Sequence, residues 1–167
     1  MFNVGNRRRI VAKTEEQATG QACDHSSQFF DPNNIEAKQF REQLALDSLE
    51  EIILWLKEGG KVGIHDATNS TYERRQAILD RVALEPDISI MFCESVCDDP
   101  VILARNMILK LSGPDYENID PKKALSDFQE RVKMYEKAYK AVGDWEEHRG
   151  VQYCKIIDVG RKVSGRF

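Results

Sequence analysis

The sequence has 167 residues, of which 41 % are hydrophobic and 31 % charged, as is typical of one globular domain and not of a disordered chain. Its formal net charge of −4 argues against broad binding to nucleic acid or anionic membranes, so an anionic ligand must be drawn by a local cluster of cations. No apolar run approaches the roughly 20 residues of a membrane span. The cysteines, which are Cys23, Cys93, Cys97 and Cys154, include no Cys-x-x-Cys pair. This pattern predicts a cytoplasmic protein with reduced thiols and no metal site.

The first third of the chain is predicted to contain one strand, one long loop and one long helix. Residues 2–5 read as a short strand that runs into the basic triplet Arg7-Arg8-Arg9. Residues 11–31 are polar and turn-rich and are expected to form the longest loop. From about Asn34, apolar residues recur at three- and four-residue spacing, which predicts a helix that Gly59-Gly60 ends.

Strands and helices alternate in the remainder. Apolar runs predict three strands, at residues 61–65, 88–93 and 152–159. Capping residues predict three helices: one capped by Asn69 or Ser70 and ended by Pro86, one opened by Asp98 or Asp99 with Pro100, and one opened by Asp120-Pro121. This alternation predicts an α/β fold with a mostly parallel sheet covered by helices on both faces.

Ligands of open parallel sheets bind at the carboxyl ends of the strands, which directs attention to Asp66 and the residues after it. A carboxylate there could hold Mg²⁺ or take a proton from an attacking hydroxyl. An ordinary turn aspartate explains Asp66 equally well, and Thr68 and Asn69 are also common capping residues. Arg74 and Arg75, near a helix start, suit an anion, although surface arginine pairs are more often simply solvated.

Two further pairs have helical spacing. Arg131 and Tyr135 are four residues apart beside an apolar stripe, as are Asn106 and Lys110, and each pair is explained as well by the edge of a core as by a ligand cleft. The phosphate-cradling motif Gly-x-x-x-x-Gly-Lys-Ser/Thr does not occur in the sequence, because Gly60-Lys61 follows a helix and is continued by valine.

Eight short strings keep their order and approximate spacing over nearly the whole chain. They are Phe2-Asn3-Val4-Gly5 with Arg8-Arg9; Phe29-Phe30 with Pro32 and Asn34; Arg41 before Leu44-Ala45-Leu46; Asp66-Ala67-Thr68-Asn69-Ser70-Thr71 with Glu73-Arg74-Arg75; Glu94-Ser95-Val96-Cys97-Asp98-Asp99-Pro100; Pro114-Asp115-Tyr116; Asp127-Phe128 with Arg131 and Tyr135; and Ile157-Asp158-Val159-Gly160. Together they resemble the kinase domain of the 6-phosphofructo-2-kinase/fructose-2,6-bisphosphatase family.

The resemblance implies a P-loop-type α/β kinase that transfers the γ-phosphoryl group of ATP, with Mg²⁺, to the 2-hydroxyl of fructose 6-phosphate. The product, fructose 2,6-bisphosphate, regulates glycolysis. By the same resemblance the residues that bind fructose 6-phosphate are Arg8, Arg41, Thr68, Arg74, Lys110, Arg131 and Tyr135. The nucleotide-binding stretch is Asn106, Met107, Ile108, Leu109 and Lys110, with Lys110 serving both ligands. The active-site positions are Asp66 and Cys97, and because phosphoryl transfer needs no thiol nucleophile, Cys97 is expected to position groups and not to react.

The sequence departs from the family pattern in several places. Arg7, His65 and Tyr72 replace a usual tyrosine, phenylalanine and arginine, and the stretch from Asn106 to Lys110 is one residue short, which would rotate Lys110 by about 100°. The family's phosphate loop, first strand and first helix, and its phosphatase domain, have no counterpart in the sequence. The chain is therefore expected to be one truncated kinase domain, residues 1–167, with exposed core surface and little kinase activity by itself.

Two alternatives stay open at this point. One is a non-catalytic remnant that binds fructose 6-phosphate, forms a homodimer or pairs with a related subunit. The other is a P-loop kinase of the polynucleotide-kinase sort, in which Asp-x-Thr-Asn followed by arginines also occurs. The acidic charge balance and the matches at Arg41, Arg131 and Tyr135 weigh against that second alternative.

Overall fold

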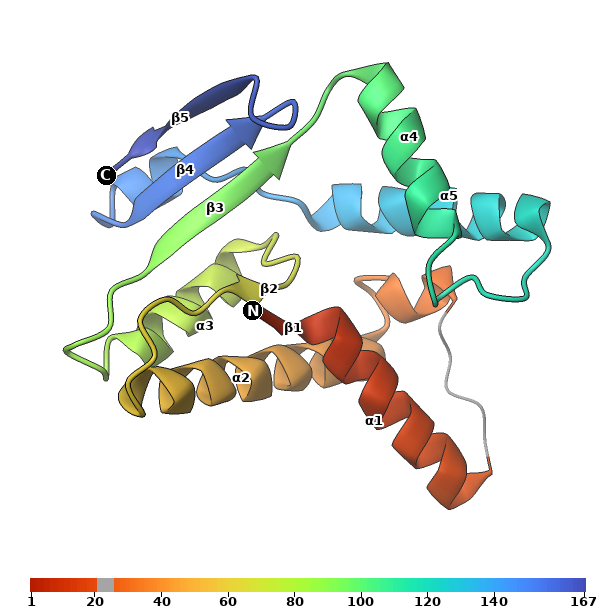
Figure 1. The fold of residues 1–167 in the computed structure, drawn as a ribbon, viewed down its shortest axis with the longest axis horizontal. Coiled ribbons are helices and arrows are strands. Elements are labelled where there is room, and N and C mark those ends of the chain that lie inside the picture. Colours follow the sequence, from red (N-terminus) through yellow and green to blue (C-terminus); the bar gives the residue numbers. More distant parts are fainter. Residues whose placement is uncertain (21–25) are drawn as a thin grey trace.

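The computed structural model describes residues 1–20 and 26–167, which leaves Cys23 outside the described residues (Figure 1). In chain order the elements are β1 (Phe2–Asn3), α1 (Val4–Thr19), the short 3-10 helix η1 (Ser27–Phe30), α2 (Ile35–Lys57), β2 (His65–Asp66), α3 (Tyr72–Val82), β3 (Met91–Val96), α4 (Pro100–Leu111), α5 (Pro121–Ala138), α6 (Asp144–Glu147), β4 (Gln152–Ile157) and β5 (Lys162–Arg166). Within these ranges no helix combines the length and the apolarity that crossing a lipid bilayer requires.

The first helix, α1, occupies a stretch that the sequence predicts to be mostly loop. Asn3 caps it, because its side-chain oxygen accepts a hydrogen bond of 2.7 Å from the backbone N–H of Asn6. Gly20, with a φ of 71°, ends it in the left-handed conformation. The predicted loop over residues 11–31 is therefore wrong up to Thr19. Lysine, glutamate and glutamine are polar and are also strong helix formers, so the polarity of this segment alone does not indicate a loop.

The long helix α2 confirms the prediction of a helix between Asn34 and Gly59-Gly60. The Asn34 side chain caps it, and its buried face packs against α3, which ends at Val82, ahead of the predicted stop at Pro86. The main core lies between these two helices and the β3–β4 pair, since burial of apolar side chains is the dominant favourable term in folding. Its buried members are Leu49, Ile53, Ile78, Val82, Phe92, Val142 and Tyr153.

Capping residues also mark the starts of the later helices. Asp99 caps α4 and Asp120 caps α5, each with a proline at the beginning of the helix as predicted. The cap of α3 is Thr71 and not the predicted Asn69 or Ser70. The Thr71 hydroxyl accepts a hydrogen bond from a backbone N–H in the first turn of the helix. The short helix α6 is absent from the prediction.

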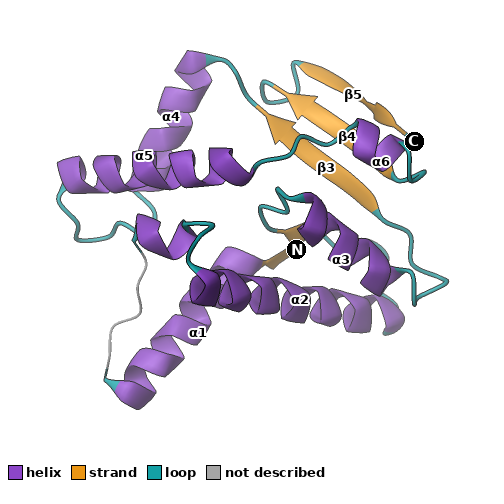
Figure 2. Cartoon of the chain, turned by 180° about the vertical axis from the view of Figure 1, so that it is seen from behind, coloured by secondary structure: helices purple, strands orange, loops and turns teal. Residues whose placement is uncertain are grey.

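The strands pair in two small sheets, which Figure 2 shows from behind. β1 and β2 are parallel, with Asn3 opposite Asp66, and β3 is parallel to β4, whereas β5 runs antiparallel to β4. The α/β class is confirmed, but the sequence predicts one sheet and does not predict β5. Asp158 and Val159 adopt positive φ angles of 46° and 59°, so the chain turns where the last strand is predicted to continue.

Pairing partners set where the strands begin and end. β1 has two residues, so β2 is only His65–Asp66, and of the predicted strand at residues 61–65 only His65 pairs. Along the next strand, pairing starts where Met91 meets Gln152 on β4, which shifts β3 towards the C-terminus relative to the predicted residues 88–93. Strand limits thus depend on partners that the local sequence does not contain.

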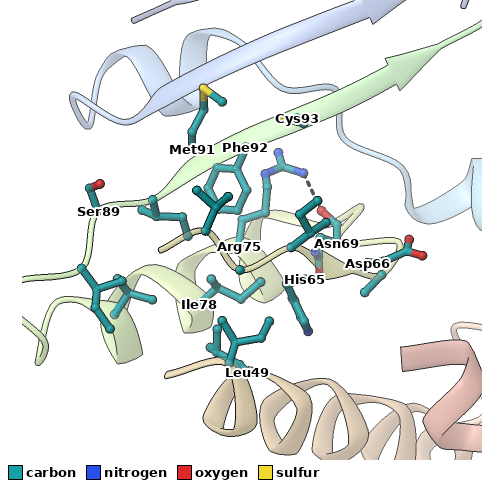
Figure 3. Close-up of a pocket in the computed structure, with 18 of the residues that line it drawn as sticks. Leu49, His65, Asp66, Asn69, Arg75, Ile78, Ser89, Met91, Phe92 and Cys93 are labelled. Atoms are coloured by element: carbon teal, nitrogen blue, oxygen red, sulfur yellow. Dashed lines mark hydrogen bonds between the residues drawn. The ribbon is translucent and has the colours of Figure 1, made fainter. Parts of the chain in front are cut away.

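A cavity of about 1210 Å³ separates β2 from β3 (Figure 3). Its walls are formed by α2, α3, residues 60–70 and β3, and include the core residues Leu49 and Phe92. β2 and β3 each lie at the edge of their sheet, so the cavity is flanked by two strand edges. Met91 and Cys93, on β3, are exposed beside it.

Candidate functional site

The 3-10 helix η1 places Phe30 where three helices meet, and Asp127 of α5 holds η1 there. One carboxylate oxygen of Asp127 accepts from the backbone N–H of Ser27 at 2.8 Å, and the other accepts from the hydroxyl of Tyr116 at 3.0 Å. Burial and this hydrogen bond raise the pKa of Tyr116 to about 12. In the η1 helix that Asp127 holds in place, Phe30 is only 5 % exposed.

Three arginines from different helices surround the ring of Phe30. The guanidinium carbons of Arg131, Arg8 and Arg41 lie 3.7, 5.3 and 5.9 Å from the ring centroid. The ring of Tyr135 lies 5.6 Å away, centroid to centroid. An aromatic face attracts cations, so Phe30 stabilises guanidinium groups that would otherwise repel one another. We call Phe30 with Arg8, Arg41, Arg131 and Tyr135 the Phe30 cluster.

Asp115, in the loop between α4 and α5, binds two arginines of this cluster and a third beside it. Nη2 of Arg8 lies 2.8 Å from both of its oxygens, and Arg9 and Arg131 each donate at 3.1 Å. Burial alone would raise the pKa of Asp115, but the charges and hydrogen bonds of the arginines outweigh it and lower the pKa to about 2. Three guanidinium groups thus converge on the carboxylate of Asp115.

Arg74 connects to the cluster through Arg41. Its Nη2 donates to the backbone oxygen of Arg41 at 3.3 Å, while its Nε binds Glu42. Arg41 in turn donates through Nη1 to the backbone oxygen of Phe29, and burial lowers its pKa, as it does that of Arg8. Arginine stays protonated despite such shifts. The structure therefore brings together five of the seven residues predicted to bind the sugar phosphate.

The remaining predicted ligand-binding residues lie elsewhere. Thr68 is exposed between β2 and α3, and Lys110 is exposed on α4, and neither takes part in the contacts described for the Phe30 cluster. The predicted nucleotide stretch from Asn106 to Lys110 forms the second half of α4, with Met107 half-buried and the other four side chains exposed. α4 packs against α5, the helix that carries Arg131 (Figure 1).

The two predicted active-site positions lie at the ends of strands in different sheets. Asp66 ends β2 with an exposed carboxylate that accepts a hydrogen bond from the side-chain amide of Asn3. The same Asn3 caps α1, so Asp66 is linked to the start of the helix that carries Arg8. Cys97 follows β3, is half-buried and has its Sγ 3.9 Å from the backbone oxygen of Asp99.

Arg75 supports the turn behind Asp66 and is not an anion-binding partner of Arg74. It is 1 % exposed, and its Nε donates to the buried carboxylate of Glu146 at 2.6 Å. Its Nη1 donates to the backbone oxygens of Asn69 and Lys140 at 3.1 and 3.0 Å, and Figure 3 shows the first of these bonds. The suggestion that Arg75 faces phosphate is therefore wrong, because its charge is already paired inside the protein.

Sequence reasoning gave no role to Phe30 or Asp115, which organise the arginines. Both residues stand within strings that resemble the family, and this resemblance is the only feature of the sequence that points to them. Asp115 is 107 residues from Arg8 along the chain, so no spacing rule connects them.

The sequence matches known proteins over nearly its whole length. A family model described as 6-phosphofructo-2-kinase matches residues 1–165. A probable 6-phosphofructo-2-kinase of Schizosaccharomyces pombe is 45 % identical over 97 % of this chain and 23 % of its own length. The 6-phosphofructo-2-kinase 1 of Saccharomyces cerevisiae is 43 % identical over 98 % of this chain and 19 % of its own length. The human 6-phosphofructo-2-kinase/fructose-2,6-bisphosphatase 3 is 40 % identical over 97 % of this chain and 30 % of its own length. The chain spans about a quarter of the length of the curated relatives it matches. It belongs to the 6-phosphofructo-2-kinase family.

Proposed function

We propose that the protein acts as a 6-phosphofructo-2-kinase and that the Phe30 cluster binds the phosphate group of fructose 6-phosphate. The observation that carries this proposal is the sharing of one carboxylate, Asp115, by Arg8, Arg9 and Arg131. In a chain with a net charge of −4, these three guanidinium groups converge on one point. Convergent guanidinium groups are what recognition of a dianionic ester requires.

The reaction joins two anionic substrates, so the site must offset their repulsion as well as orient them. Guanidinium groups in a partly buried site do both, because hydrogen bonds to charged groups are worth roughly 1.5–3 kcal/mol each. Arg74, which pairs with Glu42, links the Phe30 cluster to α3, which begins just after the turn that follows Asp66. Thr68, in that turn, and Lys110 are assigned to the sugar phosphate by family resemblance.

Asp66 is the residue we assign to the chemistry of transfer. Its carboxylate is exposed at the end of β2, where it suits removal of the proton from the 2-hydroxyl or binding of the Mg²⁺ that accompanies ATP. Mg²⁺ commonly takes one or two protein carboxylates together with phosphate oxygens, so a single aspartate fits it. The segment from Asn106 to Lys110 is assigned to ATP, and Cys97 to positioning.

The wider setting forms part of the same proposal. Residues 1–167 would belong to one kinase domain with a P-loop-kinase-like, mostly parallel sheet. The protein would work in the cytoplasm without nucleic-acid or membrane partners, as a homodimer or paired with a related subunit.

Binding of fructose 6-phosphate, followed by titration calorimetry, tests the proposal without requiring ATP. Arg131→Gln should weaken the affinity at least about tenfold, because a charge-assisted contact is lost. Lys133→Gln is the matched control, since it removes one positive charge from an exposed position on the same helix. Equal affinities of the two variants would overturn the assignment of the cluster.

Two further measurements test the recognition of the phosphate group and the role of Asp66 separately. Fructose without the phosphate should compete weakly, because the cluster recognises the ester. Asp66→Asn should keep the affinity for fructose 6-phosphate while losing most of the phosphoryl transfer that the unsubstituted protein shows. Unchanged transfer by that variant would remove Asp66 from the chemistry and leave the binding assignment intact.

A further inference from the structure

Two cysteines that the sequence separates by 61 residues face each other across the parallel strands β3 and β4. Cys93 and Cys154 are direct partners in the ladder, and their Sγ atoms are 3.4 Å apart. The preceding pair in the register, Phe92 and Tyr153, is buried in the core. Side chains alternate between the faces of a strand, so the two thiols share the opposite face of this sheet.

The two thiols differ in their access to solvent. Cys93 is exposed and lines the cavity beside β3, the strand on which Figure 3 labels it. Cys154 is buried, with 7 % of its surface exposed. An accessible thiol beside a shielded one is the arrangement in which the first can meet an oxidant and the second can resolve the product.

We propose that Cys93 and Cys154 form an oxidation site at which a hydroperoxide converts the two thiols into a cross-strand disulfide. The Cys93 thiolate attacks the peroxide oxygen, the O–O bond breaks, and the sulfenic acid of Cys93 forms while the alcohol, or water from hydrogen peroxide, departs. The Cys154 sulfur then attacks Sγ of Cys93 and displaces the hydroxyl group, which leaves as water with the Cys154 proton. Two thiols and one hydroperoxide thus give one disulfide, one alcohol and one water.

The geometry permits this bond with little backbone movement. Adjacent strands lie about 4.8 Å apart, which is within the Cα separation of roughly 4.4–6.8 Å that disulfides span. The sulfur atoms must approach by only about 1.4 Å, which side-chain rotation can supply. Cys97 differs, because the contact described for its sulfur is with the backbone oxygen of Asp99 and not with a second thiol.

The environment of Cys93 determines how readily the reaction starts. Partial desolvation of the sulfur and the neighbouring Cys154 raise the pKa of the Cys93 thiol, so little thiolate is present at neutral pH. Attack on peroxide is therefore the slow step, and the nearby Cys154 captures the sulfenic acid before a second peroxide reaches it. The pair is expected to stay reduced until peroxide is abundant.

Peptide mapping of the oxidised protein tests the proposal without any mutation. The protein is treated with hydrogen peroxide, its remaining thiols are blocked with iodoacetamide under denaturing conditions, and it is digested without reduction. A peptide pair joined through Cys93 and Cys154, absent after dithiothreitol, is the expected product. Cys93 as sulfinic acid with Cys154 alkylated would overturn the proposal.

A variant that retains only the two facing cysteines makes the thiol count unambiguous. In Cys23→Ser/Cys97→Ser, peroxide should remove both titratable thiols, and dithiothreitol should restore both. Adding Cys93→Ser should leave the remaining thiol of Cys154 largely unoxidised under the same treatment, because it is buried and lacks its partner. Loss of the Cys154 thiol at the same rate without Cys93 would contradict the assignment of Cys93 as the entry thiol.

Discussion

Nη2 of Arg8 lies 2.8 Å from each carboxylate oxygen of Asp115, and this contact connects the first helix to the loop before α5. Arg9 and Arg131 bind the same carboxylate. Asp115 therefore has two effects: it holds α1 against α5, and it keeps three guanidinium groups close together despite their mutual repulsion. The proposed binding of an anionic ester depends on the second effect.

The first prediction concerns the stability that this carboxylate contributes. Asp115→Asn keeps the size of the side chain but removes its charge, so the largely buried Arg8 loses the ion pair with Asp115. The free energy of unfolding in urea at neutral pH should fall by about 2 kcal/mol. Asp80→Asn, at an exposed position on α3, is the control and should change it by less than about 0.5 kcal/mol. Similar losses in the two variants would contradict a special role for Asp115.

The same ion pairs predict a dependence of stability on pH. The pKa of Asp115 is lowered from 3.8 to about 2 in the folded protein, so folding favours the ionised form. The contribution is complete above about pH 5, and it is lost as the pH falls through the unfolded value towards 2. After allowance for solvent screening it amounts to about 1–2 kcal/mol.

Urea unfolding of the wild type and of Asp115→Asn between pH 5 and pH 2.5 measures this contribution as a difference, which cancels the titration of other carboxylates. The gap in unfolding free energy should narrow steadily as the pH falls. A gap that stays constant over this range would mean that the Asp115 carboxylate does not titrate with a lowered pKa.

The third prediction concerns the ring that the arginines surround, and it rests on the proposed binding of fructose 6-phosphate. Phe30→Leu keeps an apolar side chain but removes the aromatic face beneath Arg8, Arg41 and Arg131. The affinity for fructose 6-phosphate should weaken about five- to tenfold, because each cation–π contact at such sites contributes roughly 0.5–1 kcal/mol and fixes a guanidinium group.

Phe40→Leu is the matched control for this ring. Phe40 lies on α2 and contacts Phe29, so the variant makes the same chemical change beside the cluster and not within it. Calorimetric titration of both variants should show a loss of affinity for Phe30→Leu alone, even where both lower the unfolding free energy. Equal losses of affinity would point to general destabilisation in place of a role for the Phe30 ring.

The sequence predicted best those features that depend on a few neighbouring residues. Asn34, Asp99 and Asp120 satisfy backbone N–H groups two or three positions away, so the starts of α2, α4 and α5 could be identified from local chemistry. The sequence does not predict α1 because this segment lacks a continuous apolar stripe. Among the α1 side chains whose burial the structure describes, the buried ones are Arg8 and Ala12. The position of β5 depends on pairing with β4 after a turn of non-glycine residues with positive φ, which no local pattern indicates.

The candidate site was predictable as a set of residues but not as an arrangement. Family resemblance supplied Arg8, Arg41 and Arg131, which lie on three helices far apart in the chain. Their meeting point at Phe30 and their shared carboxylate at Asp115 depend on tertiary packing, and periodicity within one helix cannot report on that. The pairing of Arg75 with Glu146 was hidden for the same reason.

The last prediction concerns that buried pair. The Arg75 and Glu146 side chains are 2 % and 0 % exposed, and Glu146 also accepts from the backbone N–H of Gly143 at 2.7 Å. Arg75→Met or Glu146→Leu alone should lower the unfolding free energy by about 3–5 kcal/mol, because each leaves a charge buried without its partner. The double variant should lose clearly less than the sum of the two, since it leaves no unpaired charge. Urea unfolding of all four proteins completes the cycle, and strictly additive losses would show that the two charges do not stabilise each other.

Amide hydrogen exchange gives a second measurement. In Arg75→Met the exchange rate should rise around Asn69, because Arg75 donates to the backbone oxygen of Asn69, whose φ is 41°.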